Sequence, residues 1–403
     1  MIMDSYQDNK NYAYLPDDLL VQILNKVPHT VDKMNSMFDI QDEPIRNGIS
    51  ELKNQCLIKK ITSKESSSSL IAVDGSNIVE KMTGTDILLA IGVGVEGLRE
   101  NKDVEWGERK NQYYHYQTVL PHGEANMRLI QGIMFLMELS VLAQAEHEIR
   151  IMDGNHLTPI LKINSMLSAK DENAGRDYCE ALSEFLKDTY NKIIPDIPDI
   201  ISAAFKNECI IAMAKYSSSR DVIESYLKDI SGICVDDKTF FSLGLEENEY
   251  LKPLSVGQSK DENRIWGDLH IKCNLETIKE KDELNQSFER ILEKIKTKDL
   301  KGSKKKSEIY YTYYKPYTDG PAYRIELKEV LAIDQTRLEK YLLSIKHQII
   351  FPEIREPYPQ YLVDLMAKSI AMGLFSIQDA IRLSPDLKID KGKFNLLFNY
   401  RSK

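Results

Sequence analysis

The sequence predicts an α/β protein in which a mixed β-sheet is flanked by helices. Two observations lead to this class. Short apolar runs of strand length alternate with helical segments along most of the chain, and one long apolar helix separates three successive strands from a fourth. Because a helix is the usual crossover between parallel strands, we expect the sheet to contain parallel as well as antiparallel pairs.

The first 62 residues are expected to form a helical N-terminal extension. Leu19, Leu20, Ile23 and Leu24 share one helix face, and Pro28 is expected to end this helix before a second, more polar one up to about Lys60. The serine-rich stretch after it resembles a linker.

The core elements follow the linker in a regular order. The apolar run SLIAVDGS predicts a short buried strand that ends at Asp74-Gly75. The expected elements that come next are strands at Thr85–Leu98 and Tyr113–Leu120, a helix at Gly123–Glu148 and a strand at Glu148–Gly154.

The second half of the chain continues this alternation. Expected strands are Cys209–Lys215, Ile265–Cys273, Glu308–Pro316 and Ala322–Leu327. Expected helices are Asp171–Lys192, Ser219–Ile230, about Glu280–Lys298, Asp334–His347, Gln360–Met372 and Ser376–Leu383.

Composition limits the classes of protein that fit this chain. Its 403 residues are 42% hydrophobic and 29% charged, which is ordinary for a globular protein. The formal net charge of −9 argues against a uniformly positive surface that coats nucleic acid, although a local basic groove remains compatible with it.

Cysteine usage and hydropathy point to the cytoplasm. The 5 cysteines are scattered and form no CxxC pair, which is typical of reduced thiols rather than of a disulfide framework or a zinc ribbon. No apolar run approaches the ~20 residues of a membrane-spanning helix, and the first residues do not resemble a secretory signal. We therefore expect a cytoplasmic protein without a membrane partner.

Two aspartates at expected strand ends are the most informative candidates. Asp74 and Asp153 each follow an apolar strand and precede a glycine. If their strands are neighbours, the two carboxylates repel each other, and a divalent cation between them removes that cost. Oxygen ligands favour Mg²⁺ or Mn²⁺ over zinc. Each Asp-Gly pair alone is equally consistent with an ordinary turn.

Three further charged residues lie where they could join such a site. Glu138 interrupts an apolar helix, and Glu124 near the start of that helix is the rival carboxylate, which the helix dipole alone could favour. Lys215 ends another apolar strand and could neutralise a scissile phosphate. A boundary glutamate and a strand-end lysine are the ordinary alternatives.

Taken in order, six segments resemble the NurA nuclease family, whose members are RNase H-like DNases that work with the HerA hexameric translocase. The segments are IAVDGS, the in-helix glutamate, IMDG, IIAMAK, AYRIEL and PYPQYLVDLMAKSI. The resemblance spans residues 70–373. It implies a nuclease domain there, with an RNase H-like core and a charged helical insertion at about 275–306, followed by a helical tail at 374–403.

The resemblance also implies a set of functional residues. Asp74, Glu138, Asp153 and Asp364 match metal ligands, which would hold two Mn²⁺ or Mg²⁺ ions, and Lys215 matches a catalytic lysine that contacts DNA. Arg324, beside Tyr323, falls in the family's late aromatic-arginine strand and is expected to contact DNA. The family pattern further implies a homodimer, a HerA-type ATPase partner, and exonucleolytic end processing with endonuclease activity in DNA end resection or anti-phage defence.

The sequence departs from this family at several positions. Asn155-His156 follows the second Asp-Gly, Val363 precedes the last ligand, and Glu356 precedes PYP. His156 and His347 are reserve candidates for the site. A non-catalytic adaptor with a degenerate core, which binds DNA or the ATPase, is the alternative function.

Two other motifs have competing interpretations. The spacing of Gly92, Gly94 and Gly97 fits a dinucleotide-binding fingerprint, but no apolar helix follows it, so we expect no such cofactor. The basic stretch that contains Lys304, Lys305 and Lys306 could line a DNA path or form a solvated loop.

Overall fold

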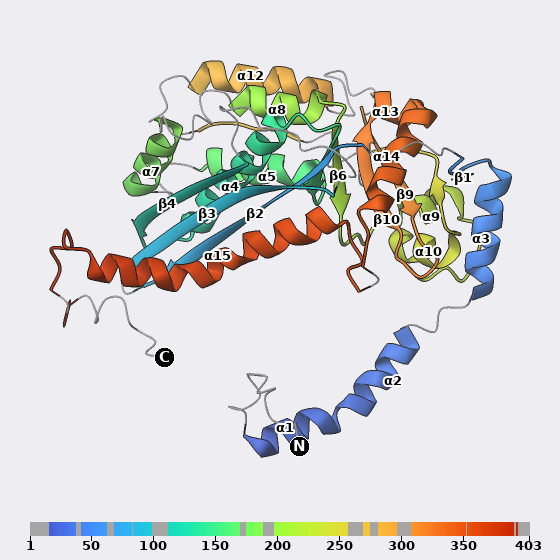
Figure 1. Ribbon diagram of the computed structural model, residues 1–403, viewed down its shortest axis with the longest axis horizontal. Helices are drawn as coiled ribbons and strands as arrows, with labels where there is room; N and C mark the ends of the chain where they lie inside the picture. The colour runs from blue at the N-terminus through green and yellow to red at the C-terminus, as the bar shows by residue number, and fades with distance from the viewer. Residues whose placement is uncertain are drawn as a thin grey trace.

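The computed structural model describes residues 16–37, 42–62, 68–82, 84–98, 112–169, 175–187, 197–256, 269–274, 281–295, 308–351, 353–390 and 392–393. Ten strands in this part of the chain form one sheet (Figure 1). They are β1 (Ile58–Lys60), β2 (Leu70–Lys81), β3 (Thr85–Glu96), β4 (Tyr113–Pro121), β5 (Ile149–Asp153), β6 (Ile210–Ala214), β7 (Glu249–Leu251), β8 (Leu254–Ser255), β9 (Ile309–Lys315) and β10 (Tyr323–Lys328).

The sheet is mixed, as the sequence predicts. Its order is β1-β7-β9-β10-β6-β5-β2-β3-β4, with β8 beside β9. Strands β2, β3 and β4 form an antiparallel meander, whereas β5 pairs with β2 and β6 in parallel. The expected crossover between β4 and β5 is made by α4 (Ala125–Gln144).

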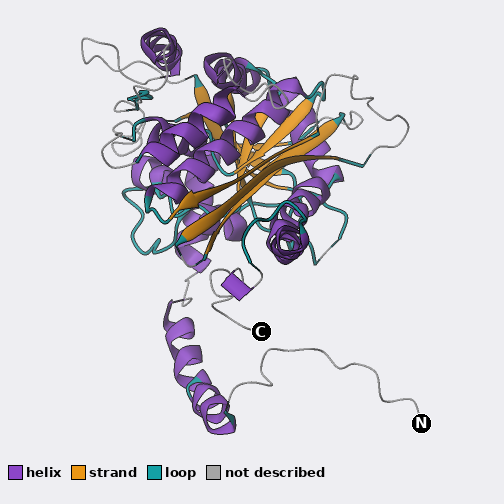
Figure 2. Cartoon of the chain, turned by 90° about the vertical axis from the view of Figure 1, so that its left-hand side faces the viewer, coloured by secondary structure: helices purple, strands orange, loops and turns teal. Residues whose placement is uncertain are grey.

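Two helical layers enclose the sheet (Figures 1 and 2). One layer, on what we call the α4 face, comprises α4, α5 (Leu157–Leu167), α7 (Arg176–Lys187), α8 (Ile197–Lys206) and α12 (Lys281–Ile295). The opposite α15 face carries α14 (Gln335–His347) and α15 (Tyr358–Leu383). The other helices that the structure describes in the domain are α3 (Asp42–Asn54), α9 (Asp221–Tyr226), α10 (Asp237–Gly244) and α13 (Glu329–Ile333).

Alternation along β2 assigns its side chains to these two faces. Ile71 and Val73 join the core on the α4 face, and Leu70 and Ala72 join the core on the α15 face. Helix α4 is long and apolar enough to span a membrane, but 78% of its apolar window is buried inside the fold. It is therefore the central core helix of this domain.

The N-terminal segment divides into two parts. Helices α1 (Asp17–Asn25) and α2 (Val27–Met37) project from the domain in Figure 1, and α1 contributes no buried residue. In contrast, α3 buries Ile45, Ile49 and Leu52, and β1 pairs with β7 at the edge of the sheet. The expectation of one continuous extension through residue 62 therefore misses that its second half packs into the domain. Pro28 lies in the first turn of α2, where its missing N–H is tolerated.

Three other expectations about secondary structure differ from the structure. Strand β2 does not end at Asp74-Gly75 but continues to Lys81, because β3 pairs with it along its whole length. No strand forms at 269–273, and the rest of the strand expected at Ile265–Cys273 lies outside the described residues. Helix α15 is continuous where two helices were expected, so the domain limit at residue 373 falls inside it.

Gly75 is required by close packing rather than by a turn. A Cβ atom at this position would lie 2.5 Å from Glu138 Oε1 and 2.7 Å from Met134 Cγ, both on α4. Gly92 on the neighbouring strand has the same role, since its Cβ would lie 2.8 Å from Met137 Cβ. Gly92 and Gly94 lie within β3 and serve helix packing. Close packing against α4 therefore accounts for Gly92 and Gly94.

We expect Gly75→Ala to lower the free energy of unfolding by about 1–3 kcal/mol, because α4 or Glu138 must move to admit the methyl group. Urea denaturation in the presence of EDTA measures this effect on the metal-free protein. Gly373→Ala in α15 is the matched control. Apart from the backbone of its own helix, no atom of the residues that the structure describes lies within 4 Å of its Cβ position, and removal of a helical glycine should stabilise the protein by about 0.5–1 kcal/mol. Equal effects of the two substitutions would contradict this account.

Candidate metal centre

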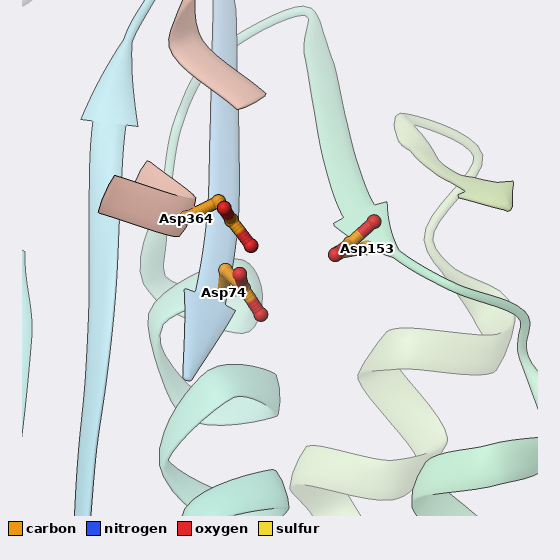
Figure 3. A group of neighbouring side chains, drawn as sticks. All are labelled: Asp74, Asp153 and Asp364. Atoms are coloured by element: carbon orange, nitrogen blue, oxygen red, sulfur yellow. The ribbon is translucent and has the colours of Figure 1, made fainter. Parts of the chain in front are cut away.

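Three aspartates from different elements converge on the α15 face. Asp74 lies in β2, Asp153 is the last residue of β5, and Asp364 lies in α15. One carboxylate oxygen from each residue lies within 4.8 Å of the others (Figure 3). Val73 and Met152 are partners in the parallel β2–β5 register, so the next residue of each strand is one of the two strand aspartates.

The environment of Asp74 opposes its ionisation. Burial raises the pKa of this carboxyl to about 6, and the negative charge of Asp153 contributes to the increase. The Gly75 N–H donates a 2.8 Å hydrogen bond to Asp74 Oδ1, which offsets only part of this cost. No described cation forms an ion pair with Asp74, although Lys215 lowers its pKa from a longer range. A cation at this position would remove the repulsion.

Lys215 supplies the positive charge among the carboxylates. Its Nζ lies 3.4 Å from Asp153 Oδ2, 3.2 Å from Asp364 Oδ1 and 3.4 Å from Glu356 Oε2. Burial alone would lower the pKa of Lys215, but the three carboxylates outweigh it and raise the pKa above its usual value. The ammonium therefore stays charged beside the aspartates.

Three residues of this centre were not among the predicted site residues. Gln360 Nε2 donates a 2.7 Å hydrogen bond to Asp153 Oδ1, and Lys368 Nζ lies 2.6 Å from Asp364 Oδ2. Glu356 is the third carboxylate around Lys215. Gln360 and Lys368 lie four residues before and after Asp364, so helical spacing around that aspartate could have indicated both.

Glu138 approaches from the other side of the sheet. It is buried, with 2% of its surface exposed, and its carboxylate lies beside Gly75 on the α4 face. Burial raises its pKa well above the usual value, and the charges of Asp74 and Asp153 add to this increase. Glu138 is therefore near the aspartates through the gap at Gly75, but it does not belong to the group whose oxygens lie within 4.8 Å.

Arg324 lies on the opposite face from Lys215. Its neighbours Tyr323 and Ile325 pack in the α15-face core, so alternation places Arg324 on the α4 face. The guanidinium contacts Glu326 at 3.4 Å, lies 4.4 Å from the centre of the Tyr311 ring, and lines a cavity of about 600 Å³.

The remaining candidates lie away from the three aspartates or outside the described chain. His156 is fully buried and pairs with Glu326 at 3.1 Å, Glu124 precedes the first turn of α4, and His347 is exposed at the end of α14. Lys304, Lys305 and Lys306 lie outside the described residues.

The chemistry of the donor set fits a hard divalent cation. The three carboxylates are oxygen donors from separate elements, and burial together with the charge of Asp153 raises the pKa of one of them, Asp74. Mg²⁺ and Mn²⁺ prefer such oxygen ligands. A zinc site usually includes histidine or cysteine, and this group contains neither.

Comparison with known proteins bears on the fold. No family model matches the sequence, and no curated protein matches it significantly. Among solved structures, the NurA nuclease from Sulfolobus solfataricus is similar over 92% of this chain and 100% of its own, with a TM-score of 0.51 and 14% identity. A NurA structure bound to dAMP and manganese is similar over 95% of this chain and 100% of its own, at 12% identity and a TM-score of 0.47. The mixed sheet, its flanking helices and the order of its elements therefore give this chain the NurA fold.

Proposed function

We propose that this protein is a divalent-metal-dependent deoxyribonuclease. The observation that carries the proposal is the convergence of Asp74, Asp153 and Asp364 at one point of a NurA fold. The nearby lysine adds a cation that suits a phosphodiester substrate. A buried aspartate whose pKa is raised beside other carboxylates, as Asp74 is here, is typical of functional sites and is costly to maintain for stability alone.

Each residue has a defined role in this proposal. Asp74, Asp153 and Asp364 would hold Mn²⁺ or Mg²⁺, and Glu138 would complete the ligand set for two ions. The bound metal would activate water and stabilise the leaving oxygen. Gln360 orients Asp153 by its hydrogen bond. Lys215 neutralises charge that develops on the phosphate, at the cost of its contacts to the carboxylates.

The proposed biological setting rests on the sequence resemblance alone. We propose a cytoplasmic homodimer that acts with a HerA-type hexameric ATPase in DNA end resection or anti-phage defence. Exonucleolytic end processing would be its main reaction, with endonuclease activity beside it. Arg324 and the segment that contains Lys304, Lys305 and Lys306 are proposed to contact DNA.

The direct test is cleavage of linear DNA by the purified protein. We expect degradation with Mn²⁺ or Mg²⁺ and none with EDTA, in assays with and without a HerA-type ATPase from the same source. If no condition gives cleavage although the protein binds DNA or the ATPase, the adaptor function replaces the nuclease.

A further inference from the structure

A cavity adjoins the three aspartates on the side of Lys215. Its volume is about 220 Å³, and it is formed by the end of β6, the start of α10, the β9–β10 connection and the segment before α15. Lys215 and Gln360 line it, and both also contact Asp153. Lys215 and Gln360 therefore separate the cavity from the candidate metal centre and contact both.

Two cations in the cavity wall have no carboxylate partner among the described residues. Lys238 donates a hydrogen bond to the backbone carbonyl of Lys215, which leaves two of its three N–H donors for another acceptor. Burial lowers the pKa of Lys238, and the negative charge of Asp236 opposes this effect. Arg355 also lines the cavity and is exposed. Glu356, the acid of the cavity, already pairs with Lys215.

An aromatic ring stands at the rim of the same cavity. Tyr216 follows Lys215 directly, and 92% of its surface is exposed. The Nζ of Lys238 lies 5.9 Å from the centre of its ring. An exposed tyrosine beside unpaired cations has the composition of a nucleotide subsite, in which a base stacks on the ring and the cations hold a phosphate.

We propose that this cavity binds the terminal phosphate of a DNA strand, with the terminal base stacked on Tyr216. This inference rests on the proposed nuclease function and adds that the site selects a phosphorylated strand end. A terminal phosphomonoester carries close to two negative charges, which matches Lys238 and Arg355, whereas an internal phosphodiester carries one. The volume is below the range of about 300–1,000 Å³ that encloses whole drug-sized ligands, so it suits a phosphate group with its sugar outside.

Binding of matched oligonucleotides without metal tests the inference. The probes are one single-stranded DNA 12-mer in three forms, with a 5′-phosphate, a 3′-phosphate or hydroxyls at both ends, each with an internal fluorophore. Fluorescence anisotropy in EDTA at about 0.15 M salt gives their dissociation constants. We expect one phosphorylated form to bind about tenfold more tightly than the hydroxyl form, because charged hydrogen bonds are added. The form that gains identifies the end.

Substitutions should remove the preference and leave general DNA binding intact. Arg355→Gln and Lys238→Met are each expected to reduce the tenfold ratio to less than about threefold, and Arg355→Lys should retain part of it. Arg176→Gln is the matched control, because Arg176 is an exposed arginine on α7 at the other end of the sheet and pairs with Glu180.

The outcomes separate this inference from the proposed function. Equal affinity for all three forms, or a preference that survives Arg355→Gln and Lys238→Met, would overturn the terminal-phosphate site while metal-dependent cleavage stands. A preference that these substitutions remove, in a protein that cleaves no DNA, would retain the site and reject the nuclease.

Discussion

Asp74→Asn is expected to abolish metal-dependent DNA cleavage and, in EDTA, to make the protein more stable than the wild type. Loss of the carboxylate removes one of the three oxygens that lie within 4.8 Å of each other, so we expect cleavage to fall by about three orders of magnitude or more. The amide is nearly isosteric, and its oxygen can still accept the Gly75 N–H.

The expected gain in stability follows from the raised pKa of Asp74. The carboxyl binds its proton more tightly in the folded protein, with a pKa of about 6, than in the unfolded chain, where 3.8 applies. The folded state therefore holds more protons between these values, and stability is lost as pH rises through this window. Above it, the ionised carboxylate costs up to about 3 kcal/mol, which the neutral amide avoids.

Thermal unfolding in EDTA measures the gain in stability, and thermal unfolding in Mn²⁺ measures the loss of metal binding. The wild type should be stabilised by Mn²⁺, whereas Asp74→Asn should have the higher melting temperature in EDTA at pH 8 and gain little from the metal. Asp379→Asn is the matched control, because Asp379 is an exposed aspartate on α15, the helix that carries Asp364. If Asp74→Asn is less stable than the wild type in EDTA, the carboxylate has a structural partner and the metal-centre assignment fails.

Asp74 and Asp153 could be predicted from the sequence because they depend on local patterns, whereas Asp364 was expected only from the resemblance to NurA. An apolar strand followed by an aspartate is readable from the chain, and adjacent parallel strands bring two such positions together. The same reasoning misread Gly75 as a turn, because a close approach between a helix and a strand depends on tertiary packing that no local pattern records. It also missed Gln360 and Lys368, although both lie four residues from Asp364 on the same helix, a spacing that brings side chains together.

The sequence also did not predict which face of the sheet each of two basic residues, Lys215 and Arg324, occupies. Lys215 directly follows one apolar strand and Arg324 lies within another, and both were expected to contact DNA. The antiparallel register places Arg324 opposite Ala214, the residue before Lys215, so alternation directs the two cations to opposite faces. A shift of one residue in that register would have placed them together, and register is set by contacts across the whole sheet.

Lys215→Met is expected to separate metal binding from catalysis. The substitution leaves Asp153, Glu356 and Asp364 without their shared cation, so the metal-free protein should lose about 1–3 kcal/mol of unfolding free energy. Mn²⁺ no longer competes with an ammonium for the same oxygens, so its affinity should rise. Cleavage should nevertheless fall by about 10²–10³-fold, because the charge that stabilises the reacting phosphate is gone.

Titration calorimetry with Mn²⁺ and cleavage rates at saturating metal measure the two effects separately. Lys340→Met is the matched control: its side chain is 31% exposed against 25% for Lys215, and it pairs with Glu148 on the surface at 3.3 Å. We expect that variant to change stability by less than about 1 kcal/mol and to leave cleavage unaltered. Weaker Mn²⁺ binding by Lys215→Met would mean that the lysine organises the carboxylates for the metal instead of competing with it, and unaltered cleavage would remove it from the reaction. A tighter metal site that cleaves more slowly is the result that only a catalytic cation predicts.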